Sequence, residues 1–401
     1  MKIPSQELLR EAQALLPEAV KLRRRIHMHP ELGLDLPETK AAVLQSLEGM
    51  DLEVLESKTT SGVVAALCGA RPGPTLVLRG DMDALPMPED TDLEFKSKVS
   101  GAMHACGHDS HVAMLAQAAR LLHQHRDQLS GTVKFMFQPG EEGHAGAKHM
   151  LDEGLLDDAD AAFALHIFPL LPNGIVATRP GPLLASADLF EIEVVGRGGH
   201  ASMPHHAVDP IPVACELVLA LQSYVTRRVD AFDPAVITVA RIHAGTTGNV
   251  IPESATIAGT IRSISERTRE QVQAGIQRLA KGITEAHGLE ARVQLQPGYP
   301  VTVNHDRFTE FAMETARELL GAERVIEQPA PAMGAEDWSY VLQRVPGAMA
   351  FLGVRPDDAE PVPCHSNRMV LNEAGMVQGI ALHAAVALRY LDGQPRNFSL
   401  A

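Results

Sequence analysis

One short stretch of the chain, residues 103–114, concentrates side chains that could bind a metal ion. Sulfur, imidazole and carboxylate groups are the ligands that zinc and similar transition ions prefer. Taken alone, the stretch also fits a buried structural thiol with surface histidines nearby. An amphipathic helix follows directly, with Asp109 or Ser110 expected to cap it. The candidate ligand residues fall within eight positions and are His104, Cys106, His108, Asp109 and His111.

Further candidate ligands follow short apolar runs that are typical of β-strands. These runs alternate with helical patterns and lie at residues 75–78, 132–138, 161–167 and 348–354. The alternation predicts an α/β fold with a mostly parallel sheet flanked by helices. Ligands bind such sheets outside the carboxyl ends of the strands, where this chain has Asp81, Asp83, Glu141, Glu142, His166 and His365. Crowded carboxylates repel one another unless cations lie between them, which favours a metal centre.

Bulk properties limit the classes of function. The 401 residues suggest two domains, and the formal charge of −15 argues against nucleic acid or an anionic membrane as the main partner. Four scattered cysteines without a CxxC pair predict no disulfide framework. The N-terminus lacks the apolar core of a signal peptide, and no apolar run approaches the ~20 residues that cross a bilayer. We therefore expect a soluble, cytoplasmic protein.

The pattern changes between residues 187 and 296. Strands and helices there follow the order βαββαβ, which is typical of a ferredoxin-like α+β domain. Proline and glycine residues at 180–182 and 297–300 are typical of hinges. We predict that residues 187–296 form an inserted domain, and that residues 1–186 and 297–401 form the metal-binding catalytic domain.

Several motifs together resemble one family over nearly the full length of the chain. They include GDMDALPMPE (80–89), MHACGHDSHVAML (103–115), QPGEEGHAGA (138–147), GRGGHASMPH (196–205), TTGNVIPE (246–253) and GAEDWSY (334–340). The family is that of the dinuclear metallohydrolases, which includes aminoacylases, hippurate hydrolases, glutamate carboxypeptidases and dipeptidases. The chain is most similar to the branch of N-acyl-amino-acid and auxin-conjugate amidohydrolases.

The resemblance implies roles for particular residues. Glu141 would be catalytic, and the inserted domain would be a lid and the contact of a homodimer or a higher homo-oligomer. Many relatives outside this branch have histidine where Asp81 stands, so Asp81 is not carried over as a ligand. The implied metal ligands are Cys106, His108, Glu142, His166 and His365. Zinc or manganese suits this set best, and cobalt or nickel would also fit.

The predicted function is hydrolysis of the amide bond of N-acyl-L-amino acids. Two divalent ions would activate a water molecule as hydroxide, and Glu141 would act as general base. Asp83 is expected to orient a ligand histidine. His200 is expected to donate to the developing oxyanion, and it could do so from a dimer partner. Asn249 and Arg262 are candidates for binding the substrate carboxylate, although a structural role for Arg262 also fits.

Other functions remain open at this point. A dipeptidase or carboxypeptidase could use the same dinuclear site. A metal-free thiol hydrolase could use Cys106 as its nucleophile, although no His-Asn or His-Asp pair is assigned to it. An inactive metal-binding protein is a further alternative, which the presence of Glu141 disfavours. The glycines at 196–199 lack the spacing of a phosphate-binding loop.

Overall fold

The computed structural model describes residues 3–357, 360–394, 396, 398 and 399. The chain forms two compact units. Unit 1 contains Met1–Leu183, Val303–Ala330 and Asp337–Ala401, and unit 2 contains Leu184–Thr302 and Pro331–Glu336. Unit 2 therefore extends beyond the predicted insertion and takes in a short segment, Pro331–Glu336, that the sequence prediction assigned to the catalytic domain.

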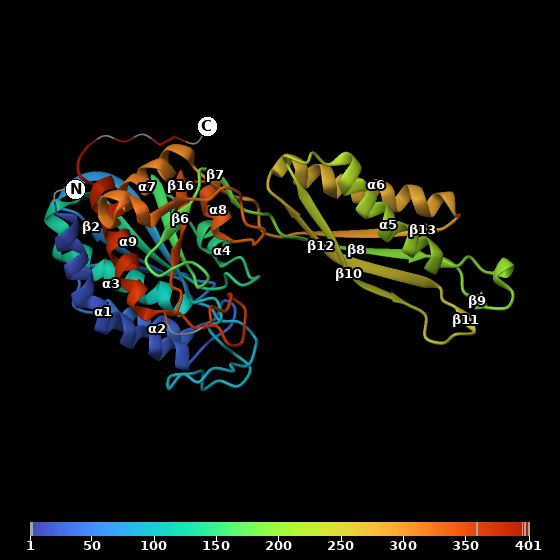
Figure 1. The fold of residues 1–401 in the computed structure, drawn as a ribbon, viewed down its shortest axis with the longest axis horizontal. Coiled ribbons are helices and arrows are strands. Elements are labelled where there is room, and N and C mark those ends of the chain that lie inside the picture. Colours follow the sequence, from blue (N-terminus) through green and yellow to red (C-terminus); the bar gives the residue numbers. More distant parts are fainter. Residues whose placement is uncertain (1–2, 358–359, 395, 397, 400–401) are drawn as a thin grey trace. The chain divides into compact units, whose positions relative to one another are not determined.

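Unit 1 is built on an eight-stranded sheet with the order β1-β2-β4-β3-β5-β16-β6-β15. Strands β2, β6 and β16 of this sheet are labelled in Figure 1. Strand β3 pairs in parallel with β4 and β5, β5 with β16, and β6 with β15, whereas β1–β2, β2–β4 and β16–β6 are antiparallel. The predicted mostly parallel sheet is thus confirmed. The strands are Glu53–Glu56 (β1), Val63–Cys68 (β2), Arg71–Asp81 (β3), Ser130–Gln138 (β4), Ala161–Phe168 (β5), Val176–Thr178 (β6), Val325–Glu327 (β15) and Gly347–Gly353 (β16). Two short strands, β7 (Gly181–Leu184) and β14 (Thr302–Asn304), pair separately.

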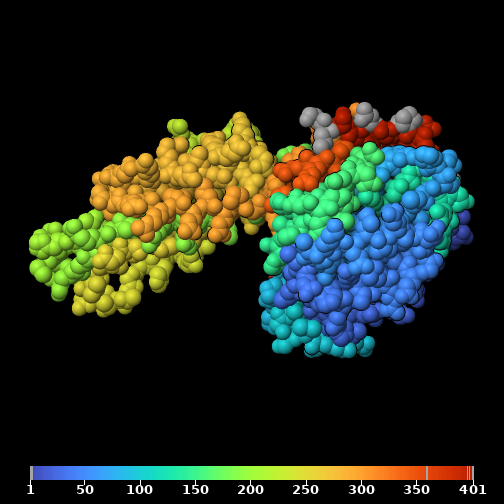
Figure 2. All heavy atoms as spheres, turned by 180° about the vertical axis from the view of Figure 1, so that it is seen from behind, coloured from blue at the N-terminus to red at the C-terminus, as the bar shows by residue number. Residues whose placement is uncertain are grey.

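Helices cover both faces of this sheet, as predicted. One layer is formed by α1, α3, α7 and α9, which contact one another, and the other by α4 and α8. Successive side chains of a strand point to opposite faces of the sheet. In β5, the alternate residues Phe163, Leu165 and Ile167 belong to the core beneath the larger helix layer. The helices are Ser5–Met28 (α1), Pro37–Ser46 (α2), His108–Gln124 (α3), Gly146–Asp152 (α4), Asp306–Leu320 (α7), Trp338–Leu342 (α8) and Met376–Tyr390 (α9). The N-terminal part of the chain, blue in Figure 2, forms much of the visible face of unit 1.

Unit 2 contains a four-stranded antiparallel sheet with the order β10-β12-β8-β13 and two helices. The βαββαβ order agrees with the sequence prediction. Alternating residues of β8, including Phe190, Ile192 and Val194, pack beneath the helices in one core. The elements are Asp188–Val195 (β8), Gly199–His200 (β9), Pro210–Arg228 (α5), Ala235–Ala244 (β10), Val250–Ile251 (β11), Ser254–Ser263 (β12), Glu266–Ala286 (α6) and Glu290–Pro297 (β13).

Short 3-10 turns complete the secondary structure at Arg126–Gln128, Pro204–His206, Ala322–Arg324 and Glu373–Gly375. Within the part of the chain that the structure describes, no helix combines the length and the apolar character that crossing a bilayer requires.

Candidate metal centre

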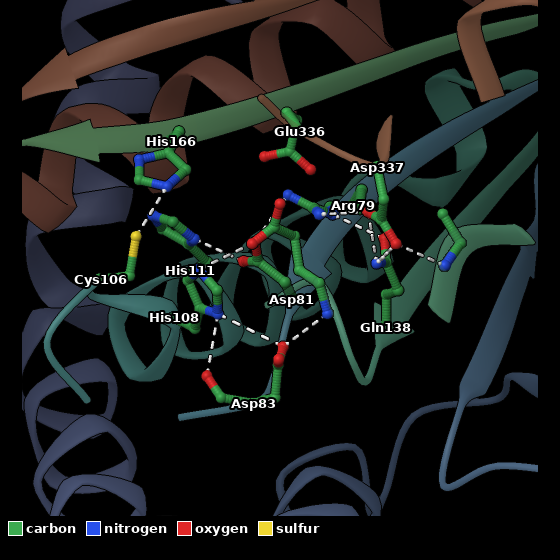
Figure 3. A network of polar contacts seen from close by, with 12 residues as sticks. Arg79, Asp81, Asp83, Cys106, His108, His111, Gln138, His166, Glu336 and Asp337 are labelled. Carbon is green, nitrogen blue, oxygen red and sulfur yellow. Dashed lines mark hydrogen bonds and ion pairs between the residues drawn. The ribbon is translucent and has the colours of Figure 1, made fainter. Parts of the chain in front are cut away.

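The candidate ligands of unit 1 come from the ends of neighbouring parallel strands and from the start of one helix. Strand β3 ends at Asp81 beside Gln138, the last residue of β4. Glu141 and Glu142 follow β4, and His166 lies near the end of β5. Helix α3 begins at His108, so the loop before it brings Cys106 to the same edge of the sheet (Figure 3). The location matches the ligand-binding edge of parallel sheets.

The five residues with implied ligand roles form overlapping groups. Ligand atoms of Cys106, His108 and His166 lie within 4.8 Å of one another, and so do those of Cys106, Glu142 and His365. The Cys106 Sγ atom lies 3.4 Å from His166 Nε2, and His365 Nε2 lies 3.1 Å from Glu142 Oε1. Cys106 is therefore shared by two potential ligand groups, which is the placement that a thiolate bridging two cations would need.

Two of the histidines are held so that one ring nitrogen faces this cluster. His108 donates from Nδ1 to the main-chain oxygen of Asp83, 2.9 Å away, and its buried Nε2 makes no hydrogen bond. His166 donates from Nδ1 to the main-chain oxygen of Ile167 at 2.6 Å and presents Nε2 to Cys106. A main-chain acceptor fixes the tautomer and leaves Nε2 free to coordinate, which is the usual arrangement of metal-binding histidines.

The carboxylate of Asp83 holds the loop that carries the two glutamates. Its Oδ1 accepts the amide of Glu141 and its Oδ2 accepts the amide of Glu142, both at 2.9 Å. His108 Nδ1 lies 3.5 Å from Oδ1 and bonds instead to the main chain of Asp83. Sequence reasoning anticipated the contact with a histidine and missed the contact with the loop. The turn also needs Gly140 and Gly143, whose φ angles are +69° and +85°.

Asp81 is occupied by other partners. Its Oδ1 accepts from His111 Nδ1 at 2.5 Å, and its Oδ2 lies 2.7 Å from Arg79 Nη1 and 3.3 Å from His108 Nε2. His111 Nε2 in turn accepts the amide of Ile167 at 2.8 Å, so both nitrogens of this ring are used inside the protein. The buried Arg79 is a cation that sequence reasoning did not assign to the site, because nothing in its spacing distinguishes it from a surface arginine.

Electrostatics favour a positive charge in the cluster. Burial opposes protonation of His108, but the carboxylates of Asp81, Asp83 and Glu142 outweigh it and raise its pKa to about 10. Burial and the neighbouring His111 hold the pKa of His166 well below its usual value, so this ring is neutral. Sulfur, imidazole and carboxylate donors in such a field fit borderline divalent cations such as Zn²⁺.

The thiol of Cys106 lies in surroundings that disfavour a metal-free nucleophile. Its hydrogen bond with Cys364, followed by burial, raises the pKa of Cys106 well above its usual value. A catalytic cysteine needs the opposite shift, because the thiolate is the nucleophile. This direction of the pKa argues against the thiol-hydrolase alternative.

His365 reaches the cluster from a separate loop. Its φ angle of +67° is rare for a residue with a side chain, and its amide bonds to the main-chain oxygen of Ala105 at 2.8 Å. More than half of the side chain is exposed, at 55%. Its contact with Glu142 raises its pKa, although burial opposes the shift. This strained conformation directs the imidazole toward Glu142, at the edge of the cluster.

A second buried network lies behind the start of α3. Asp109 Oδ2 accepts from His27 Nδ1 at 2.7 Å and lies 3.1 Å from Arg23 Nε. The expected capping role of Asp109 or Ser110 is wrong, because α3 begins after Gly107 without a side-chain cap. Asp109 is used instead as the counter-ion of two buried basic groups from α1. Its distant partners, more than eighty positions earlier in the chain, could not be recognised from local sequence.

The remaining candidates belong to unit 2 and fall into two places. His200 and Asn249 lie together, because Val250 pairs with His200 and the Ala201 amide bonds to the main-chain oxygen of Asn249 at 3.1 Å. His200 Nδ1 accepts the amide of Ser202 at 3.1 Å, so in the neutral ring Nε2 carries the proton. Arg262 lies near the end of β12, about 26 Å along the strand from its first residue, Ser254, by residue spacing. It is half-buried and has no ion-pair partner among the described residues.

Comparison with known proteins identifies the class. The family model described as Peptidase family M20/M25/M40 matches residues 77–389, and the chain belongs to this family of metal-dependent hydrolases. A solved structure of a dinuclear metal-binding peptidase from Bacillus subtilis matches with a TM-score of 0.83 at 34% identity, over 94% of this chain and 99% of that one.

Two relatives with named activities are similar to this chain over most of its length. IAA-amino acid hydrolase ILR1-like 2 of Arabidopsis thaliana is 41% identical over 93% of this chain and 85% of its own length. Thermostable carboxypeptidase 1 of Saccharolobus solfataricus is 39% identical over 92% of this chain and 95% of its own length. The names of these relatives describe an amino-acid-conjugate hydrolase and a carboxypeptidase, so the similarity fixes the class of reaction but not the substrate.

Proposed function

We propose that the protein hydrolyses the amide bond of N-acyl-L-amino acids and requires two divalent cations. The observation that carries this proposal is the position of Cys106 in two overlapping groups of potential ligands. Family membership and the similarity to an amino-acid-conjugate hydrolase support it. The residues that would hold the ions are Cys106, His108, Glu142, His166 and His365. Zinc or manganese is the proposed metal.

The ions, when bound, supply Lewis acidity toward a water molecule and a carbonyl oxygen. Glu141 is the proposed general base. Its side chain is buried at 6% exposure, its amide is fixed by Asp83, and its carboxylate approaches ligand atoms of His108 and Glu142 within 4.8 Å. It would take a proton from the attacking water and pass it to the nitrogen of the leaving amino acid. General acid–base catalysis of this kind contributes about 10²–10⁴-fold.

His200 is the proposed donor to the oxygen of the substrate carbonyl. Its tautomer supports this role, because Nδ1 accepts the Ser202 amide and Nε2 is left to donate. Arg262 is proposed to bind the substrate carboxylate, and its lack of an ion-pair partner among the described residues leaves its donors available. Asn249 beside His200 would add a polar contact to the substrate.

The separation of these residues within unit 2 supports the homodimer. His200 pairs with Val250, which comes before β12, whereas Arg262 lies near the far end of β12, about 26 Å from Ser254 at its start by residue spacing. A small substrate cannot span a separation of this size. If both contact one substrate, the two side chains come from two copies of unit 2. We therefore propose that a partner subunit supplies His200 and Asn249, and that unit 2 serves as lid and dimer contact.

A dipeptidase or carboxypeptidase is the second candidate, and the carboxypeptidase relative favours it. The test is a substrate panel on enzyme reconstituted with metal, using N-acetyl-, N-benzoyl-, long-chain acyl- and aminoacyl-glycine. The proposal expects cleavage of the acyl substrates with kcat/KM well above that for the aminoacyl substrate. Cleavage confined to substrates with a free α-amine would replace the proposal with the dipeptidase function.

A further inference from the structure

A second cysteine lies beside the cysteine that two ligand groups share. The side chains of Cys364 and Cys106 are hydrogen-bond partners. Both thiols are reduced in the structure, and Cys364 is partly exposed whereas Cys106 is 7% exposed. A reagent dissolved in water therefore has access to Cys364 first.

Main-chain and side-chain contacts hold the two loops together. The amide of His365 bonds to the main-chain oxygen of Ala105 at 2.8 Å, and each of these residues is next to one of the cysteines. Met369, farther along the second loop, packs with Ala105 in a small buried cluster. The two loops that carry the thiols are therefore held together by the fold.

Cys364 is not explained by the proposed metal centre. Among the described residues, its sulfur joins none of the groups of potential ligand atoms, whereas Cys106 joins two of them. A small apolar residue could fill the same position against the core if packing were its only role. Two neighbouring thiols, one of them accessible, are instead the requirement for a reversible disulfide.

We propose that Cys364 and Cys106 form a disulfide when the metal-free protein meets a peroxide, and that this bond blocks the loading of metal. The Cys364 sulfur attacks the peroxide, the O–O bond breaks, and a sulfenic acid and one water form. The Cys106 sulfur then attacks the sulfenic sulfur, the S–O bond breaks, and a second water leaves. In total the two thiols lose two protons and two electrons, which reduce one hydrogen peroxide to two waters.

The consequence of this bond follows from the shared position of Cys106. A sulfur in a disulfide is no longer a thiolate and cannot serve either ligand group. Bound metal would protect Cys106 by occupying its sulfur, and a thiol reductant would restore metal loading. This consequence rests on the proposed metal centre, whereas formation of the disulfide depends only on the two cysteines.

The test uses the full-length protein after chelation, with and without hydrogen peroxide, followed by alkylation, digestion and mass spectrometry. We expect a linked peptide pair containing Cys106 and Cys364 that has lost two hydrogens, and its absence from metal-loaded samples. Cys364→Ser should abolish the linked pair, whereas the matched control Cys215→Ser, which changes an exposed cysteine of unit 2, should retain it.

A second measurement follows the uptake of Zn²⁺ by the same samples. Oxidised wild-type protein should lose metal uptake and regain it with reductant, whereas Cys364→Ser treated in the same way should keep its uptake. Alkylated Cys364 together with over-oxidised Cys106 in the treated wild type would overturn the disulfide. If the linked pair forms but reduced, chelated protein binds no metal, the proposed metal centre fails and the disulfide stands.

Discussion

Replacing Asp83 with asparagine should loosen the loop that carries Glu141 and Glu142 at the proposed metal centre. The carboxylate accepts the amides of Glu141 and Glu142, each at 2.9 Å. Asparagine retains one acceptor oxygen and turns an amino group toward the other amide. The loss of one hydrogen bond to a charged group costs about 1.5–3 kcal/mol. Since about 1.4 kcal/mol corresponds to a tenfold change, this loss corresponds to about 10–100-fold in an equilibrium constant.

We expect the lost hydrogen bond to lower both the affinity for metal and the turnover rate. Glu142 is a proposed ligand on the released loop, so the affinity for Zn²⁺ should fall by about 10–100-fold. Glu141 should also be misplaced, and a displacement of about 1 Å in a catalytic group costs about 10²-fold in rate. Calorimetric titration of chelated protein with Zn²⁺ measures the first effect, and kcat at saturating metal and substrate measures the second.

A matched control is Asp90→Asn, which changes an exposed carboxylate farther along the same loop. Circular dichroism and thermal unfolding of both variants would show whether either one fails to fold. If folded Asp83→Asn binds Zn²⁺ and turns over like the wild type while Asp90→Asn does the same, the carboxylate does not position the loop and the reasoning is refuted.

Three further predictions concern single side chains. Glu141→Gln should lower kcat by about 10²–10⁴-fold with unchanged metal content, and a wild-type rate would exclude the general base. Asp109→Asn should destabilise the protein by about 1.5–3 kcal/mol in urea unfolding, because the hydrogen bond from His27 and the ion pair with Arg23 lose their charged acceptor. Arg23 keeps its ion pair with Glu373, and His27 keeps its contact with Glu89. Although burial opposes ionisation, Arg23 and then His27 hold the pKa of Asp109 far below its usual value. The stability that the ionised Asp109 contributes is therefore complete above pH ~4 and is lost as the pH falls further. If Asp109→Asn remained as much less stable than the wild type in acid as at neutral pH, the assignment would be contradicted. His200→Ala should lower kcat by about 10²–10³-fold, while the neighbouring exposed His206→Ala should not.

The sheet and the site edge could be predicted because their signals are local. Apolar runs such as residues 161–167 are buried on both faces of a central parallel strand, so they are continuous in sequence. Charged or imidazole residues at the end of these runs or directly after them lie at the carboxyl edge of the sheet. That rule alone is enough to predict that Glu141 and His166 lie at one place.

The parts that sequence could not predict depend on contacts between distant segments. The carboxylate of Asp83 accepts hydrogen bonds from main-chain amides 58 and 59 positions away. Every residue type except proline has such an amide, so the sequence does not indicate which amides are bound. Asp109 could equally have been a helix cap, and only the approach of α1 selects its ion pairs. The neighbouring position of Cys364 and Cys106 likewise depends on how two loops meet, since the two residues are 258 positions apart in the chain.

The number of divalent ions bound per chain is the most direct test of the proposed centre. Chelated wild-type protein and Cys106→Ala would be dialysed against Zn²⁺ or Mn²⁺, and bound metal would be measured by mass spectrometry of the elements. Two ions per wild-type chain, with loss of both sites or marked weakening in Cys106→Ala, is the expected result. A wild-type chain that binds none, or a variant that still binds two with unchanged affinity, would contradict the shared thiolate.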